Sequence, residues 1–214
     1  VLTFCRLTYS QETAEQVLAA DAALPLVTIL QEQAPSGSYL FNTCTVIGRL
    51  CRFCRDTGSA NGVIAAGLLP ALVKTLRSER ALDKSFMPYV LANAMPGLCT
   101  TQPPESLEEL AHSFSDWLSR IDVESEPGAA ALRMKHIAIV FRKMPLPCLL
   151  LATFLPDLAR FVGPCLAFPE CDHRREAVAS LLNCVDVLCA ERDSSVYSDF
   201  CFHLLLQGTA PRLW

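Results

Sequence analysis

The chain has 214 residues, of which 51% are hydrophobic and 19% charged, and its net charge is −4. Charged residues usually make up about 25% of a globular chain, so this composition excludes a disordered tail as the main state. The negative charge argues against general nucleic-acid binding, which uses a strongly basic face. A mean hydropathy of +0.31 indicates an unusually continuous core or apolar surface that a partner covers.

No segment of the sequence is expected to span a membrane or to direct secretion. The most apolar run, residues 146–155, is interrupted by Pro147 and has about half the length that a membrane helix needs. Residues 1–9 lack the basic start and apolar stretch of a signal peptide. The 11 cysteines are scattered over apolar helical positions, so we expect reduced core thiols and a cytoplasmic, reducing compartment.

The predicted elements repeat in chain order as a short first helix, a second helix and a longer third helix. First helices are predicted at residues 11–18, 59–64 and 105–110, and the apolar run 146–154 is predicted to be a buried helix. The second helices carry apolar markers that begin at Leu26, Leu72, Trp117 and Leu158. The third helices end on apolar anchors 48, 46 and 44 residues apart, namely Leu50, Leu98, Met144 and Leu188. Mostly apolar residues three, four and seven positions before each anchor predict one buried stripe per third helix.

This period divides the chain into repeats at about 6–55, 56–101, 102–145 and 146–192, with a partial repeat at 193–214. Loops between second and third helices are expected at 33–38, 78–84, 122–128 and 163–172. Leu2 lies 48 residues before Leu50, so residues 3–5 look like the tail of another third helix. We expect one all-α domain over 1–214, with further protein or a partner covering both ends, because terminal repeats of solenoids normally carry a polar cap.

Residues 61–78, Asn-Gly-Val-Ile-Ala-Ala-Gly-Leu-Leu-Pro-Ala-Leu-Val-Lys-Thr-Leu-Arg-Ser, resemble the armadillo repeat family, and residues 20–27 resemble it more weakly. The resemblance implies a right-handed α-solenoid of about four repeats, with HEAT-like character in the last two, whose third helices line a concave face. Peptide-binding members often carry Asn just before the anchor and Trp four residues earlier. This chain has Arg49, Gly97, Lys143 and Val187 before its anchors and no Trp ladder.

Basic residues concentrate on the predicted third helices. Ten of the 18 Lys and Arg residues lie on these helices or at their starts, whereas acidic residues gather elsewhere, as at 105–126. A basic groove with interspersed amides would suit an acidic extended segment through charge-assisted hydrogen bonds. The candidate groove residues are Asn42, Thr45, Arg49, Arg52, Asn93, His136, Lys143 and Asn183. The alternative is that they are merely solvated helix faces.

Two cysteine clusters are candidates for metal chemistry, and we expect neither to hold a metal. Cys51 and Cys54 form the one CxxC, with Cys44 on the same helical face. Zinc takes four ligands, usually from two such pairs, so small core side chains are the simpler interpretation. The second cluster is Cys165, Cys171 and His173. The sequence has no GxSxG, P-loop or GxGxxG motif, so we predict no enzyme and no cofactor.

The sequence therefore predicts a non-catalytic scaffold or adaptor that binds other proteins, with an acidic peptide segment as the favoured ligand. The alternative is a structural subunit built permanently into a large assembly, where neighbouring subunits cover its apolar surface. Nucleic acid is not an expected partner.

Overall fold

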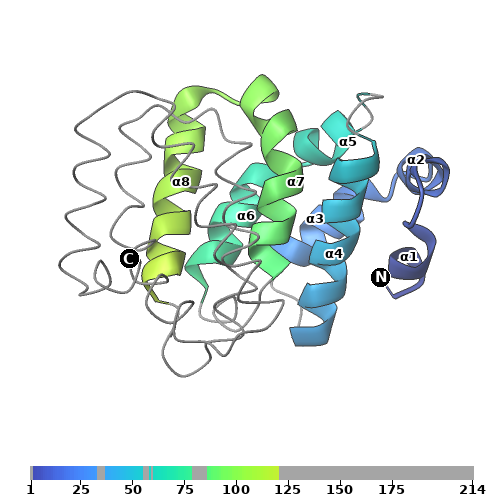
Figure 1. Ribbon diagram of the computed structural model, residues 1–214, viewed down its shortest axis with the longest axis horizontal. Coiled ribbons are helices and arrows are strands. Elements are labelled where there is room, and N and C mark those ends of the chain that lie inside the picture. Colours follow the sequence, from blue (N-terminus) through green and yellow to red (C-terminus); the bar gives the residue numbers. More distant parts are fainter. Residues whose placement is uncertain (1, 33–36, 55–57, 59, 79–85, 121–214) are drawn as a thin grey trace, which may run out of the picture. The chain divides into compact units, whose positions relative to one another are not determined.

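The computed structural model describes residues 2–32, 37–54, 58, 60–78 and 86–120. Within these ranges the regular structure is entirely helical (Figure 1), as predicted. The helices are α1 (Leu2–Leu7), α2 (Gln11–Ala19), α3 (Ala23–Gln31), α4 (Gly37–Phe53), α5 (Ala60–Ala65), α6 (Leu68–Arg77), α7 (Phe86–Thr101) and α8 (Pro104–Ser119). One compact unit holds α1 to α7 and α8 as far as Trp117. The repeats expected after residue 120 lie outside the described residues, so one domain over 1–214 stays a prediction.

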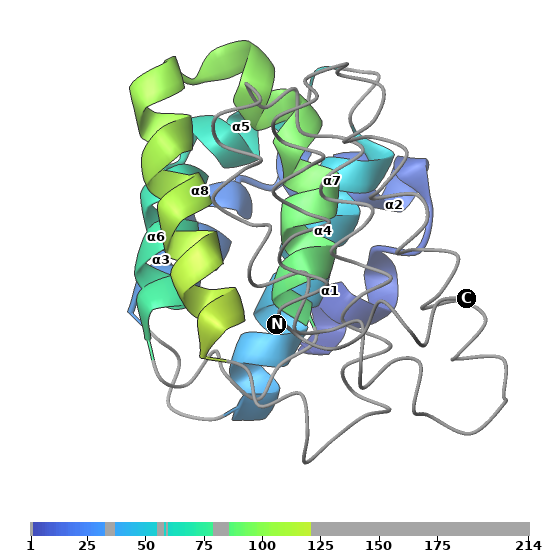
Figure 2. The same cartoon turned by 60° about the vertical axis from the view of Figure 1, so that its left-hand side comes forward.

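Two successive units have the same three-helix order, which is α2, α3, α4 and then α5, α6, α7. Like helices pack on like: α4 lies along α7, α3 along α6, and α1 against α4 (Figures 1 and 2). This arrangement confirms an α-solenoid. The predicted first helices at 11–18 and 59–64 are confirmed as α2 and α5.

A left-handed backbone residue separates the first and second helices of each unit. Gly67 has φ 94° between α5 and α6, and Asp21 has φ 54° between α2 and α3. Gly adopts this conformation without cost, and Asp tolerates it better than most residues. Pro25 and Pro70 are the third residues of α3 and α6, where the missing N–H is one that the helix could not use.

The third unit departs from the prediction. A separate first helix at 105–110 is wrong, because α8 continues from Pro104 to Ser119 and includes the second-helix marker at Trp117. Residues 105–119 contain no Gly or Pro, and none of them has a positive φ that would end the helix. Phe114 and Trp117 are fully buried, and their rings stack with centroids 5.6 Å apart.

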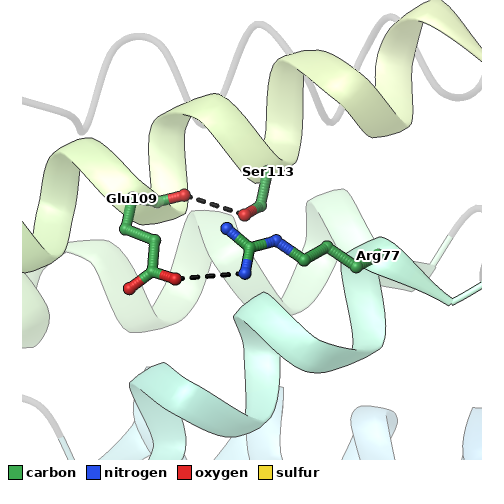
Figure 3. Close-up of polar contacts among 3 residues, drawn as sticks. All are labelled: Arg77, Glu109 and Ser113. Carbon is green, nitrogen blue, oxygen red and sulfur yellow. Dashed lines mark hydrogen bonds and ion pairs between the residues drawn. The ribbon is translucent and has the colours of Figure 1, made fainter.

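An ion pair links α8 to α6, and a hydrogen bond within α8 lies beside it (Figure 3). Arg77 Nη1 lies 3.1 Å from Glu109 Oε1, and the Ser113 hydroxyl donates a 2.8 Å hydrogen bond to the Glu109 carbonyl. Both ionic side chains are more than half exposed, so the pair contributes little beyond fixing the orientation of α8.

The core is made by the predicted stripes. The anchors Leu50 and Leu98 are fully buried, as are Ile47 and Met95 three residues earlier. Among the described residues no single helix is long and apolar enough to cross a membrane. The pair α2 and α3, bent by 84°, reaches that length and composition only when the two helices are taken together.

Candidate binding face on α4 and α7

Apart from Tyr39 and Cys99, the accessible residues of α4 and α7 recur every three or four positions, as one face of each helix requires. On α4 they follow the order Phe41, Asn42, Thr45, Arg49, Arg52 and Phe53. On α7 they are Tyr89, Asn93, Pro96, Gly97, Thr100 and Thr101. Because α4 lies along α7, we name these two stripes together the α4–α7 face.

Two predicted site residues, Thr45 and Asn93, occupy equivalent positions 48 residues apart. The Thr45 hydroxyl donates to the Phe41 carbonyl at 2.8 Å, and the Asn93 amide nitrogen donates to the Tyr89 carbonyl at 2.8 Å. The Asn93 side chain is therefore held in one orientation by its own helix. Its second N–H and its carbonyl oxygen extend the hydrogen-bonding capacity of the face.

Aromatic residues form another equivalent pair that the sequence prediction missed. Phe41 is 46% exposed, and Tyr89 is half-buried at the matching position of α7. A Cβ placed on Gly48 would lie 2.6 Å and 2.9 Å from two carbons of the Tyr89 ring, so the ring lies directly over Gly48. The same 48-residue spacing that aligns the anchors would have identified this pair.

Asn42 and Arg49, two of the predicted groove residues, both contact helix α1. Arg49 Nη1 donates a 2.6 Å hydrogen bond to the Cys5 carbonyl, and its guanidinium carbon lies 4.1 Å from the centroid of the Tyr9 ring. The Cys5 thiol in turn contacts Asn42 Oδ1 at 3.7 Å. The Cys5 carbonyl is among the last four of α1, which lack helical donors, so Arg49 caps α1 and fixes it to α4.

Arg52 is the exposed cation of this face, with its guanidinium carbon 5.4 Å from the Phe53 ring centroid. Helices α4 and α7 contain no Asp or Glu, so the described face carries only positive formal charge, from Arg49 and Arg52. The remaining predicted residues, His136, Lys143 and Asn183, lie outside the described residues, so their place in a groove stays a prediction.

A pocket of about 310 Å³ opens beside Asn93, between α5, α7 and the end of α4. Cys51, Asn61 and Thr100 also line it. Pro96 lies within α7 and has no N–H to give the Ala92 carbonyl, which weakens the helix at this point. The pocket extends the α4–α7 face by a recess beside the Asn93 amide.

The cysteines of α4 belong to the core. Cys44 and Cys51 on α4, and Cys54 directly after its end, are buried and form no disulfide. Burial, with a smaller effect of neighbouring Cys54, raises the pKa of the Cys51 thiol to about 12, and burial also raises the pKa of Cys44. Such thiols stay protonated and unreactive at neutral pH. Among the described residues no group of three or more His, Cys, Asp or Glu side chains could hold a metal ion.

Neither a family model nor a curated protein matches the chain. Its fold is similar to that of a computationally designed armadillo repeat protein for modular peptide recognition, with 16% identity, a TM-score of 0.57, and coverage of 99% of this chain and 81% of that one. An engineered protein from the Northeast Structural Genomics Consortium matches with 15% identity and a TM-score of 0.55, over 94% of this chain and 88% of that one. Another designed armadillo repeat protein matches with 18% identity and a TM-score of 0.50, over 94% and 89%.

Identities this low establish architecture alone. Together with the repeated packing of α2–α4 and α5–α7, they show an armadillo-like helical repeat fold.

Proposed function

We propose that this chain is a non-catalytic protein-binding scaffold whose α4–α7 face binds an extended acidic segment of a partner protein. The observation that carries the proposal is the composition of that face. It combines a fixed amide at Asn93, an exposed aromatic ring at Phe41 and an exposed guanidinium at Arg52, with no carboxylate on either helix.

The three side chains have complementary roles. The Asn93 amide can pair with the N–H and C=O groups of an extended backbone. Phe41 offers apolar contact area, and Arg52 forms charge-assisted hydrogen bonds with carboxylates. A designed armadillo neighbour made for peptide recognition supports this use of the fold. His136, Lys143 and Asn183 would extend the binding face in later repeats.

The test is fluorescence anisotropy with a labelled peptide in which Glu alternates with Leu. Arg52→Glu should weaken binding by about tenfold and reduce its salt dependence, because reversing a charge removes one attraction and adds one repulsion. Asn93→Ala should weaken binding while leaving stability unchanged or higher, since Ala favours a helix more than Asn does.

Lys74→Glu is the matched control, because Lys74 is an exposed cation on α6, outside the α4–α7 face. It makes the same change in net charge and should leave the affinity nearly unchanged. Equal losses from Arg52→Glu and Lys74→Glu would mean that only net charge matters, and the proposed face would be wrong.

A second candidate function, a permanently assembled structural subunit, is favoured by exposed apolar side chains. Leu7, Tyr9, Leu24, Tyr39 and Phe41 are all more than 45% exposed. Quantitative mass spectrometry of the native complex separates the two functions: a single stoichiometric assembly supports the subunit, and several substoichiometric clients support the scaffold. For either function we propose a reducing, cytoplasm-like location; in support, none of the described cysteines is in a disulfide.

A further inference from the structure

A second surface depression lies on residues that the α4–α7 face does not use. It has a volume of about 1,110 Å³ and is lined by α2, by the α2–α3 turn with the start of α3, and by the end of α5. Its main lining residues are Glu15, Leu18, Asp21, Leu24, Gly62 and Ala65. We name it the α2–α5 groove. Its volume exceeds the roughly 300–1,000 Å³ of typical small-molecule sites, so its size fits a segment of a macromolecule.

The groove follows from two local features of the backbone. The left-handed turn at Asp21 sends α3 off at 84° to α2 and leaves Leu24 62% exposed. Across from this turn, α5 presents only small residues, and a Cβ added to Gly62 would meet nothing within 4 Å. The space is therefore open, and a side chain placed at Gly62 would project into unoccupied volume without strain on its neighbours.

The groove has an apolar floor and an acidic rim. Leu18, Leu24 and the alanines of its walls supply the apolar surface, and its two charged residues are Glu15 and Asp21. One Glu15 oxygen accepts a 3.1 Å hydrogen bond from Gln11, which lies one turn earlier on α2. Helices α2, α3 and α5 contain no Lys, Arg or His, so no cation on these three helices offsets the two carboxylates.

The backbone around the groove is already hydrogen-bonded. Ala20, Asp21 and Ala22 donate to carbonyls of α2, and Ala66 and Gly67 donate to carbonyls of α5. The groove thus offers no open edge to which an extended strand could add. Affinity here must come from side-chain burial and charge, which is the helix-in-groove mode of recognition.

We propose that the α2–α5 groove binds an amphipathic helix of a partner protein, with apolar side chains on Leu18 and Leu24 and flanking Lys or Arg side chains beside Glu15 and Asp21. This surface is separate from the α4–α7 face and opposite to it in charge. The same chain could therefore hold an acidic segment on one face and a basic helix on another.

The probe is a fluorescein-labelled amphipathic helix of about five turns, with Leu on one face and Lys on the other. A second peptide with Glu in place of Lys is its charge-reversed counterpart. The Lys peptide should bind the wild-type chain in a saturable, salt-sensitive manner, and the Glu peptide should not bind at this site. Absence of saturable binding by the Lys peptide would overturn the proposal.

Gly62→Gln is the decisive variant, because it fills the groove with an uncharged side chain and favours the helix more than Gly does. It should lower the affinity for the Lys peptide by about tenfold, equivalent to about 1.4 kcal/mol. Asn61→Gln is its control: the residue is adjacent, exposed and on the wall of the other pocket, so affinity should be unchanged.

The charge requirement is tested with Glu15→Gln combined with Asp21→Asn, since Asn keeps the left-handed turn. Affinity should fall by about fivefold or more. The matched control, Glu105→Gln with Glu108→Gln on exposed sites of α8, should have little effect. If Gly62→Gln bound the Lys peptide with wild-type affinity, or if the two double variants lost equal affinity, the proposed binding at the groove would be wrong. Arg52→Glu should not weaken binding of the Lys peptide. This variant therefore separates binding at the α2–α5 groove from binding at the α4–α7 face.

Discussion

Replacing Gly48 by Ala tests the close packing of α4 against α7. In an open helix this change should stabilise the protein by about 1 kcal/mol, because Ala has the higher helix propensity. At Gly48 the new Cβ would lie 2.6 Å from one carbon of the Tyr89 ring and 2.9 Å from another. Contacts under 3.0 Å require the ring or the helices to move, and overpacking of this kind costs about 1–3 kcal/mol.

The expected net effect of Gly48→Ala is therefore a loss of about 1 kcal/mol of unfolding free energy. Substitutions at two other glycines provide a comparison for this stability change. Gly62→Ala enters open space and should stabilise by about 1 kcal/mol, since nothing lies within 4 Å of its Cβ. Gly97→Ala meets the Ile64 Cδ1 atom at 2.5 Å, but this is the flexible end of a side chain, so its effect should fall between the other two.

Urea unfolding followed by circular dichroism measures all three variants, and the double variant Gly48→Ala, Tyr89→Leu completes the test. In the Tyr89→Leu background, Gly48→Ala should become stabilising by several tenths of a kcal/mol, a coupling of about 1.5 kcal/mol between the two positions. If Gly48→Ala stabilised the wild-type chain as much as Gly62→Ala does, Tyr89 would not lie over Gly48, and the α4–α7 packing would be wrong.

Three further predictions concern the turns, the buried thiols and the α1 contact. Gly67→Ala should cost about 1 kcal/mol because its φ is 94°, whereas Asp21→Asn should be silent in the same urea experiment; equal effects would contradict the left-handed turns. Burial raises the pKa of Cys51 from 9.0 to about 12, so the unfolded chain loses this proton first, and unfolding free energy should fall as the pH rises from 9 to 12. Cys51→Ala should make that fall shallower, and an unchanged slope between pH 9 and 11 would refute the assignment. Arg49→Met should speed amide exchange in α1 and lower stability by about 1–2 kcal/mol, while Arg52→Met should do neither; equal exchange in both variants would refute capping of α1.

The solenoid could be predicted from the sequence because each helix carries a strong local signal. Buried anchors such as Leu50 and Leu98 repeat at 48 residues, and Gly67 followed by Pro70 marks the turn into a second helix. The prediction for the third unit was wrong, also for a local reason. Spacing alone suggested two helices, but with no Gly or Pro between 105 and 119 the backbone continues as α8.

The binding face was only partly predictable, because helical spacing gives the side of a helix but not its neighbour. Asn42, Arg49 and Arg52 share one face of α4, yet the first two contact α1 and only Arg52 is exposed. The α2–α5 groove depends on the angle between α2 and α3, which no residue pattern specifies.

The central claim is that the α4–α7 face is a binding site for an acidic segment. Its most direct test is backbone amide chemical-shift mapping of the isotope-labelled chain during titration with the Glu–Leu peptide. The claim predicts saturable shifts clustered on α4 and α7, around Phe41, Thr45, Arg52 and Asn93, with α2 unaffected. Shifts confined to other helices, or none at saturating peptide, would contradict it.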